Sequence, residues 1–457
     1  MIRRDRSLPN KPMVAELKTV AILGAGLVTK PLADYLMDRC GYRVIMATRT
    51  AAKAEAIIAG RSLGKAVAWT VDQRDTLDEL VNEADLVVSM LPPSMHIPVA
   101  NACLRAGRHL VTTSYISPEM QSLDREAREK GVLLLNEIGE DPGIDHMGAK
   151  RLIDQVTAEG GKVTALTSYG AGLPSFQHNR NPMGYKFSWS PRGVMLAAQT
   201  PAAYLKEGKT VEVPADQLFD HHWLVDIEGL GTFETYPNRD SLRYLPHFGL
   251  DESASLYRGL LRFVGWCNTM KSLIALNLLQ GNEVKDFSGK TYREFTTGLI
   301  GKSDGSVEDV ADNLGLERNS DVMKRLQWLG LFDEIPITVT RGANVDVLVD
   351  LMLRKMSYGP GETDMIIVHD EVVAEFKDRK EKRLSTLCVE GIPDGDSAMS
   401  RAVSLPAAIA TRLVLEGEIN LSGVHMPTLP DIYKPVLSEL ESIGFRFQHR
   451  KEVMAPS

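Results

Sequence analysis

The chain has 457 residues, a hydrophobic fraction of 44% and a charged fraction of 25%, the composition of a soluble globular protein with two or three domains. Its formal net charge of −8 argues against a broad basic surface for nucleic acid. No apolar run approaches the roughly 20 residues that span a bilayer, and no apolar segment of a secretory signal follows the polar residues 1–16, so no membrane partner is expected.

The cysteines, Cys40, Cys103, Cys267 and Cys388, lie far apart and form no C-x-x-C pair. This spacing argues for a reducing compartment and against a structural zinc site. We therefore expect a cytoplasmic protein without a bound metal.

From residue 17 the chain alternates short apolar runs with helical patterns. The predicted strands are Thr19–Leu23, Arg43–Ala47, Ala66–Thr70, Leu86–Leu91, His109–Thr113 and Val132–Asn136. The helices between them are expected at Lys30–Met37, Ala51–Ile58, Leu77–Glu83, Met95–Ala106 and Pro118–Lys130. Apolar strands separated by helical crossovers are typical of a doubly wound parallel sheet of the Rossmann type. We predict this α/β domain over residues 17–145.

After Asp145 the pattern changes to alternating strands between loops rich in Gly, Pro and Asn. Strands are expected at Lys162–Tyr169, Thr210–Val213 and Thr232–Tyr236, with a hairpin at Asp370-Glu371 that joins Asp364–His369 to Val372–Phe376. These segments predict a mixed α/β domain over residues 146–255 and 335–395.

Residues 256–334 are predicted to form a small helical domain, with helices at Leu256–Val264, Met270–Leu279 and Val322–Leu329. At the end of the chain, two helical patterns, Ala398–Leu415 and Ile432–Ile443, precede an expected strand at Gly444–Gln448. We expect residues 396–457 to return to the first domain and complete it.

A nucleotide-binding turn follows the first predicted strand. Gly24 permits the tight turn, and Gly26 lets a pyrophosphate approach the backbone near Leu27 and Val28 at the start of a helix. Thr29 replaces the third glycine of the usual fingerprint, which predicts looser packing of the helix on the strand. The turn lies within a series of strand–helix repeats, so cofactor binding is favoured over a purely structural turn.

The end of the second strand reads Ala47-Thr48-Arg49-Thr50 and carries no acidic residue. An acid there would bind the ribose hydroxyl of NAD, whereas an Arg accommodates the 2′-phosphate of NADP. Arg49 and Thr50 therefore predict NADP, the alternative being a solvated Arg at a strand end. Leu91 and Pro92 end the fourth strand. They are expected to contact the part of the cofactor between adenine and nicotinamide, or to form only a corner between strand and helix.

Polar residues follow the fifth and sixth strands at the same edge of the sheet, where ligands bind in such folds. Ser114 and Tyr115 end the fifth strand, and Ser117 is the expected N-cap of the next helix. Residues 137–146 crowd four carboxylates and His146 at the domain boundary. One or two of the carboxylates are expected to face a ligand, including Asp141, while His146 is expected to be structural and the spacing does not support a metal site.

The segment Asn179–Val194 reads N-R-N-P-M-G-Y-K-F-S-W-S-P-R-G-V and is too broken for a helix. It places two cations, Lys186 and Arg192, among three aromatic residues. Cations fixed among rigid rings suit a small polyanionic substrate. Further along, Asn238 and Arg239 lie in a polar turn, Y-P-N-R-D-S, that fits either a cleft or an ordinary surface turn.

Several of these segments together resemble saccharopine dehydrogenase of the NADP-dependent, glutamate-forming type, also called saccharopine reductase. They are T-T-S-Y-I-S-P-E-M at Thr112–Met120, N-E-I-G-E-D-P-G-I-D-H at Asn136–His146, G-L-P at Gly172–Pro174, the Asn179–Val194 segment, Y-P-N-R-D-S at Tyr236–Ser241, Arg341-Gly342-Ala343 and S-A-M at Ser397–Met399. The resemblance implies an NADP-binding domain, a mixed α/β domain that binds substrate and dimerises, and a small helical domain. It therefore implies a homodimer.

By the same resemblance, residues at five positions contact saccharopine: Ser114, Tyr115, Asp141, Arg192 and Asn238. Fungal-type members carry a cysteine after Ser168-Tyr169, where this chain has Gly170. An acid–base role for that thiol therefore cannot operate here.

Saccharopine is a secondary amine with three carboxylates. Loss of a hydride to NADP leaves an imine, which water cleaves to glutamate and 2-aminoadipate semialdehyde, a reaction of lysine metabolism. Arg192 is the first choice for a carboxylate clamp, with Arg239 and Lys186 as weaker candidates. Asp141 and Tyr115 are the expected acid–base residues.

Two alternatives remain at this stage. One is a homologous oxidoreductase that condenses another amine and aldehyde, such as a polyamine precursor. The other is an inactive NADP-binding regulatory protein. The presence of Asp141, Arg192 and Asn238 argues against the regulatory protein, because a sensor has no need of a clamp for three carboxylates.

Overall fold

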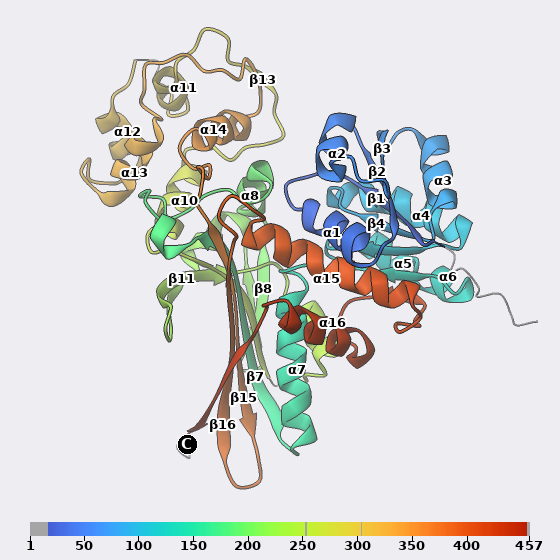
Figure 1. Ribbon diagram of the computed structural model, residues 1–457. Helices are drawn as coiled ribbons and strands as arrows, with labels where there is room; N and C mark the ends of the chain where they lie inside the picture. Colours follow the sequence, from blue (N-terminus) through green and yellow to red (C-terminus); the bar gives the residue numbers. More distant parts are fainter. Residues whose placement is uncertain (1–16, 252–253, 303, 455–457) are drawn as a thin grey trace, which may run out of the picture.

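The computed structural model describes residues 17–251, 254–302 and 304–454. Within these residues, seven parallel strands form the first sheet in the order β17-β6-β5-β4-β1-β2-β3 (Figure 1). The strands are β1 Thr19–Leu23, β2 Arg43–Thr48, β3 Gly64–Ala68, β4 Leu86–Ser89, β5 His109–Thr112, β6 Leu133–Leu135 and β17 Gly423–His425. The order confirms the predicted doubly wound sheet, whose strand order reverses between β1 and β4, the place where folds of this type bind ligands.

Helical crossovers cover both faces of this sheet. They are α1 Lys30–Asp34, α2 Ala51–Ile58, α3 Arg74–Glu83, α4 His96–Ala106, α5 Pro118–Ser122 and α6 Asp124–Glu129. The first helix continues as a π-helical turn over Tyr35–Arg39, and the predicted helix at Pro118–Lys130 is divided between α5 and α6. Ser117 caps α5 as expected, because its hydroxyl accepts the Met120 backbone N–H at 3.1 Å.

A second sheet contains nine of the described strands. Its main path is β10-β11-β12-β7-β15-β16-β18, and the hairpin of β8 and β9 attaches to β12. The strands are β7 Lys162–Pro174, β8 Ala202–Lys206, β9 Lys209–Val213, β10 Trp223–Ile227, β11 Gly231–Pro237, β12 Ser255–Arg262, β15 Asp364–Glu375, β16 Lys380–Glu390 and β18 Gln448–Met454. Because β12 and β7 are parallel and the other pairs are antiparallel, the sheet is mixed, as predicted.

The predicted helix at Leu256–Val264 is wrong. Residues 256–262 belong to β12, in which six of the eight residues are buried. A strand buried on both faces reads as a continuous apolar run, and periodicity alone cannot separate such a run from a buried helix. The strand is important for the site because β12 carries Arg258 and Arg262 into it.

The predicted hairpin at Asp370-Glu371 is also wrong. β15 runs through these residues as one strand and pairs with β7 on one side and β16 on the other. Asp370 is fully buried, and its carboxylate accepts the Ser168 hydroxyl at 2.6 Å. A pair of polar residues indicates a turn when water solvates both side chains. Here Ser168 of the neighbouring strand β7 supplies the hydrogen-bond partner of Asp370 instead.

Two helices pack between the sheets and join them. α15 (Ala398–Leu415) shares one core cluster with β1 and β4 of the first sheet and with β15 and β16 of the second. α7 (Ile144–Ala158) contacts β7 and β15, and a second cluster around it reaches β1 and β4. Figure 1 shows α15 extending from the second sheet to the helices of the first. By length and composition α15 could cross a membrane, but 72% of it is buried, which explains its apolar sequence.

The end of the chain is divided between the two sheets. α15 packs against α1 of the first sheet's layer, α16 (Pro430–Ser442) packs against α15, and β17 extends the first sheet beside β6. The expected strand at Gly444–Gln448 is wrong, because the last strand, β18, starts at Gln448 and pairs with β16 in the second sheet. Most of its side chains are exposed, so its sequence carries little of the apolar alternation by which strands are predicted.

The remaining helices cap one end of the second sheet. They are α8 Pro191–Ala197, α9 Leu245–Phe248, α10 Trp266–Ala275, α11 Tyr292–Gly298, α12 Val307–Leu314, α13 Asp321–Leu329 and α14 Asn344–Leu353, with β13 Lys285–Asp286 paired to β14 Arg341–Gly342. The apolar faces of these helices share a core cluster with the second sheet, except for α9, whose Phe248 belongs to the cluster around α7. The two sheets and this helical region therefore meet around the carboxyl edge of the first sheet.

Candidate functional site

The turn after β1 has the geometry that a dinucleotide requires. Gly24 has φ +109°, and a Cβ there would lie 2.9 Å from the Met90 carbonyl oxygen, so only glycine fits. Around Gly26 a Cβ would meet nothing within 4 Å, which leaves its outer side open to a ligand. The looser packing predicted for Thr29 is not found. Thr29 is fully buried, and its hydroxyl accepts the Gly26 N–H at 3.1 Å. Leu27 is 68% exposed and Val28 is half-buried on the same turn.

Arg49 and Thr50 are exposed at the carboxyl end of β2. The Arg49 guanidinium makes no hydrogen bond or ion pair with any described residue, so it is available for a 2′-phosphate. Leu91 and Pro92 follow β4 at the same edge. In the described part of the chain, no group of three or more His, Cys, Asp or Glu side chains could hold a metal ion.

Ser114 belongs to a buried network around His96. The His96 Nε2 lies 2.8 Å from the Ser114 hydroxyl and 3.3 Å from the Thr112 hydroxyl, while its Nδ1 lies 2.9 Å from the Ser89 hydroxyl. Burial lowers the pKa of His96 to about 4, so the ring is neutral at physiological pH. The ring ties the ends of β4 and β5 together and fixes Ser114 at the sheet edge.

Tyr115 and Asp141 meet residues of the second sheet in one cluster. The Tyr115 hydroxyl donates to Asp141 Oδ1 at 2.8 Å, and Asn238 Nδ2 donates to Asp141 Oδ2 at 3.0 Å. Arg258 Nη2 donates to Asp141 Oδ1 at 2.6 Å. The structure thus brings three of the five predicted substrate contacts, Tyr115, Asp141 and Asn238, within hydrogen-bonding distance of one another.

A second layer of buried charges supports this cluster. Arg258 Nη2 also donates to Asp145 Oδ2 at 2.6 Å, and Asp145 lies 3.2 Å from His146 Nδ1. His146 Nε2 lies 3.0 Å from Glu137, which in turn accepts the Tyr244 hydroxyl at 3.0 Å. These positions agree with the structural role expected of His146, which is fixed between two carboxylates behind the reactive cluster.

The electrostatics of the cluster separate its two aspartates. Burial raises the pKa of Asp141 above its ordinary value, although Arg258 opposes the rise. Burial also opposes ionisation of Asp145, but His146 and Arg258 together hold its pKa below the ordinary value. Burial, reinforced by the charge of Asp141, raises the pKa of Tyr115. Neighbouring carboxyl groups with pKa values pushed in opposite directions are typical of acid–base sites.

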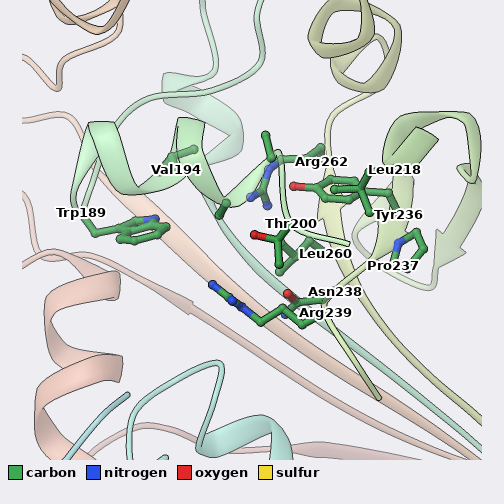
Figure 2. A pocket seen from close by; sticks show the side chains of 12 residues that line it. Trp189, Val194, Thr200, Leu218, Tyr236, Pro237, Asn238, Arg239, Leu260 and Arg262 are labelled. Atoms are coloured by element: carbon green, nitrogen blue, oxygen red, sulfur yellow. The ribbon is translucent and has the colours of Figure 1, made fainter. Parts of the chain in front are cut away.

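A pocket opens beside this cluster, between α8 and the ends of β11 and β12. Its lining residues are Trp189, Val194, Ala197, Ala198, Thr200, Leu218, Tyr236, Pro237, Asn238, Arg239, Leu260 and Arg262. In Figure 2 the guanidinium groups of Arg239 and Arg262 point toward the same space beside Trp189. Asn238 joins the pocket to the Asp141 cluster, because it lines the pocket and donates to Asp141.

The two pocket arginines have no ion-pair partner among the described residues. Arg262 is 5% exposed, its Nε lacks a hydrogen-bond partner, and its guanidinium lies 5.3 Å from the Tyr185 ring and 5.7 Å from the Trp266 ring. Arg239 lies 4.8 Å from the Tyr115 ring and has a positive φ of 57°. Arg239 is exposed, whereas Arg262 is buried, and a buried cation without a carboxylate is costly. The two groups therefore suit a ligand that brings its own carboxylates.

The other predicted cations are already paired. Arg192 Nε donates to Asp346 at 2.8 Å, its Nη2 donates to the Gly281 carbonyl at 3.1 Å, and 46% of its side chain is exposed. Lys186 is buried and forms an ion pair with Glu362. Arg192 lies in the first turn of α8, which lines the pocket, but the structure does not bring its guanidinium to Asp141. Its contact with substrate therefore stays a prediction.

Three residues of the site, His96, Arg258 and Arg262, were not predicted from the sequence. Arg258 and Arg262 were hidden because β12 was predicted as a helix, in which their side chains had no reason to face the sheet edge. His96 carries no local signal, because its hydroxyl partners come from separate strands. Arginines in an apolar run were the one available clue, since a buried cation requires a partner.

Glu140 gives the site a testable pH dependence. Its side chain is buried, Oε1 has no hydrogen-bond partner among the described residues, and burial together with Asp141 raises its pKa well above the ordinary value. The carboxyl ionises at lower pH in the unfolded chain than in the folded one, so it destabilises the fold as pH rises above about 4.3. The free energy of unfolding falls by about 1.4 kcal/mol for each unit that separates the folded and unfolded pKa values of Glu140. We expect Glu140→Gln to raise the melting temperature more at pH 8 than at pH 5.

Differential scanning calorimetry at both pH values measures this effect. Glu55→Gln, at an exposed position on α2, is the control and should show the same increment at both pH values. An equal increment for Glu140→Gln would mean that the buried carboxyl does not change its protonation on folding.

Comparison with known proteins agrees with this geometry. Residues 20–135 match the family model "Saccharopine dehydrogenase NADP binding domain", and residues 139–445 match "Saccharopine dehydrogenase C-terminal domain". The saccharopine dehydrogenase [NADP(+), L-glutamate-forming] of Pyricularia oryzae is 36% identical over 93% of this chain and 96% of its own, and that of Saccharomyces cerevisiae is 35% identical over 93% and 97%.

The fold has a solved relative of the same kind. The apo structure of saccharopine dehydrogenase (L-Glu forming) from Saccharomyces cerevisiae is 34% identical, covers 96% of this chain and 100% of its own, and superposes with a TM-score of 0.85. The chain therefore belongs to the saccharopine dehydrogenase family.

Proposed function

We propose that this protein is an NADP-dependent oxidoreductase that acts on the secondary amine of saccharopine, giving glutamate and 2-aminoadipate semialdehyde through a hydrolysed imine. The observation that carries the proposal is the cluster of Tyr115, Asp141, Asn238 and Arg258, in which the nucleotide-binding sheet meets the second sheet. A pocket with two unpaired arginines adjoins it. The relatives that carry this activity by name match nearly the whole chain.

The cofactor contributes a hydride acceptor at the carboxyl edge of the first sheet. Gly24 and Gly26 would admit its pyrophosphate at the start of α1, Leu27 and Val28 would line the same turn, and Arg49 with Thr50 would bind the 2′-phosphate. Leu91 and Pro92 would contact its middle. The open space around Gly26 and the unpaired Arg49 support this arrangement.

The pocket arginines would hold the carboxylates of saccharopine. Arg239 and Arg262 approach one space from two strands, and arginine binds carboxylates through paired N–H donors. Ser114, held by His96, and Asn238 would add uncharged donors. Arg192 would take a third carboxylate if its pairing with Asp346 exchanged for the substrate. Such contacts fix the amine and the carbon beside it in one orientation, which is a large part of the rate.

Proton transfer would fall to Asp141 and Tyr115. The amine must be uncharged before a hydride can leave the adjoining carbon, and a carboxylate whose pKa is raised accepts that proton more readily than an ordinary one. The Tyr115 hydroxyl donates to the Asp141 carboxylate and would hold that carboxylate in a fixed orientation toward the amine. Water then adds to the imine carbon, and the carbon–nitrogen bond breaks as the nitrogen regains a proton, which releases glutamate and the aldehyde.

Two other functions give different assay results. A homologue that condenses another amine and aldehyde would need fewer cationic contacts than Arg239 and Arg262 provide. A regulatory protein would bind NADP without turnover. Saccharopine and NADP are mixed with the purified protein, and the growth of NADPH absorbance is followed. Turnover of saccharopine supports the proposal, turnover only with another amine product supports the first alternative, and binding of NADP without turnover supports the second.

Cofactor choice follows from Arg49. Arg49→Asp should weaken NADP binding about ten- to a hundredfold and leave NAD binding comparatively unharmed, because a charge-assisted contact of roughly 1.5–3 kcal/mol is lost. Fluorescence titration measures both affinities. Arg125→Asp, which changes the same charge at a position with a 92% exposed side chain, is the control. A wild-type protein that uses NAD as well as NADP would disprove the role of Arg49.

The carboxylate clamp and the proton transfer can be separated by kinetics. Arg192→Ala and Arg239→Ala should mainly raise the KM for saccharopine, since a clamp binds ground and transition states alike. Asp141→Ala should mainly lower kcat and flatten one limb of its pH profile. NADP binding should survive all three changes. An unchanged KM in Arg192→Ala would leave the Asn179–Val194 segment as a packing element, and an unaltered kcat and pH profile in Asp141→Ala would assign the proton to Tyr115 or water.

Assembly and location are part of the same proposal. We infer a homodimer through the second domain, because β10 leaves an open sheet edge with Leu224 61% exposed. Light scattering at micromolar concentration should give twice the chain mass of 50.4 kDa. Leu224→Asp should shift the mass toward the monomer, whereas Val284→Asp, at a 62% exposed position in the helical region, should not. A monomeric wild type would contradict the inference.

The four free cysteines support a cytoplasmic location.

A further inference from the structure

Gly170 occupies the middle of β7, where glycine is unfavourable. It pairs with Leu260 of β12 on one side and with Val368 of β15 on the other. Its φ lies outside the positive range in which glycine is needed, so the backbone itself would accept any residue. Glycine in a strand interior loses more conformational entropy on folding than other residues, and it often marks a place where another group approaches closely.

The group that approaches Gly170 is the Asp141 carboxylate. A Cβ built on Gly170 would lie 2.7 Å from Asp141 Oδ2, 3.3 Å from its Cβ and 3.4 Å from its Cγ. Rotation of the carboxylate alone would therefore not relieve the contact, because the root of the side chain is close as well. The carboxylate is also held in place by Tyr115, Asn238 and Arg258.

A second glycine in the same strand shows the difference. A Cβ on Gly172 would meet the terminal Cε of Met399 at 2.2 Å, and the nearest other atoms lie 3.9 Å away. The end of a flexible methionine side chain can move with little loss. At Gly170, by contrast, the neighbouring group is a charged side chain with several fixed hydrogen bonds.

We propose that Gly170 is a positioning residue of the active site: its missing side chain leaves the space that the Asp141 carboxylate fills, and so sets that carboxylate among Tyr115, Asn238 and Arg258. Where a side chain stands at this position, the aspartate has to sit farther from β7. In this chain the carboxylate itself lies against the strand. The inference rests on the proposed role of Asp141 for its effect on turnover, but the contact itself can be tested without it.

The test is a double-mutant cycle of Gly170→Ala and Asp141→Ala. Alanine in place of glycine in a strand is stabilising when nothing opposes it. We therefore expect Gly170→Ala to lower the melting temperature by about 3 °C or more in the wild type, where it meets the carboxylate, and to leave it equal or higher in the Asp141→Ala background. Gly172→Ala, on the same face of β7, should have the same effect in both backgrounds.

Turnover gives an independent readout of position. Gly170→Ala should reduce kcat about tenfold or more and displace the pH profile, since small displacements of a catalytic group are costly. In the Asp141→Ala background the same change should alter the residual kcat by less than about twofold. NADP affinity should be unchanged throughout, which separates these effects from damage to the cofactor domain.

Each result decides between the two proposals. If Gly170→Ala has the same effect on stability and kcat in both backgrounds, Gly170 does not act through Asp141 and the inference is overturned. If Asp141→Ala alone leaves kcat unaltered while the stability coupling persists, the contact is real and the proposed role of Asp141 is wrong. If Gly170→Ala does not fold, recovery of a folded protein by the added Asp141→Ala supports the contact, and failure to recover excludes it.

Discussion

The site depends on one buried ion-pair arrangement, in which Arg258 bridges Asp141 and Asp145. All three side chains are almost wholly buried, with exposures of 2%, 6% and 1%. Burying charges is expensive, and the loss of one partner from such a set leaves an uncompensated charge at a cost of about 3–5 kcal/mol. Arg258 comes from β12, whereas Asp145 lies in the first turn of α7, so the bridge fixes the second sheet against the helix that follows the first sheet.

This bridge explains why the reactive cluster forms where it does. The carboxyl edge of a parallel sheet presents backbone groups and side chains toward a crevice, but it supplies only one wall. Here the second wall is provided by the ends of β11 and β12, which bring Asn238, Arg239 and Arg262. The core clusters around α15 and α7 hold the two walls in a fixed relative position. The position of the Asp141 carboxylate therefore depends on both sheets.

The sequence predicts the parts of this arrangement that are encoded locally. Apolar strands between helical segments, the glycines after β1 and the polar residues that end β5 and β6 were each identified from residues close together in the chain. Arg258 was not, because its partners Asp141 and Asp145 lie 117 and 113 residues away and its strand has no alternating pattern. At Arg192 the residue type predicted a carboxylate clamp, but the sequence does not show where the guanidinium points. Its direction is set by Asp346, which lies 154 residues further along the chain.

The distribution of charge also reconciles an acidic protein with an anionic substrate. The chain carries a net charge of −8, yet the carboxylates beside the pocket contribute less negative charge than their number suggests. Arg258 offsets one of the two charges of Asp141 and Asp145, and burial favours the protonated forms of Asp141 and Glu140. Arg239 and Arg262 form no ion pair with a carboxylate in the described part of the chain. The potential inside a low-dielectric pocket is governed by its nearest unpaired charges and little by screened surface groups. The two arginines therefore leave the pocket positive toward a ligand while the protein as a whole is negative, which suits the anionic substrate proposed above.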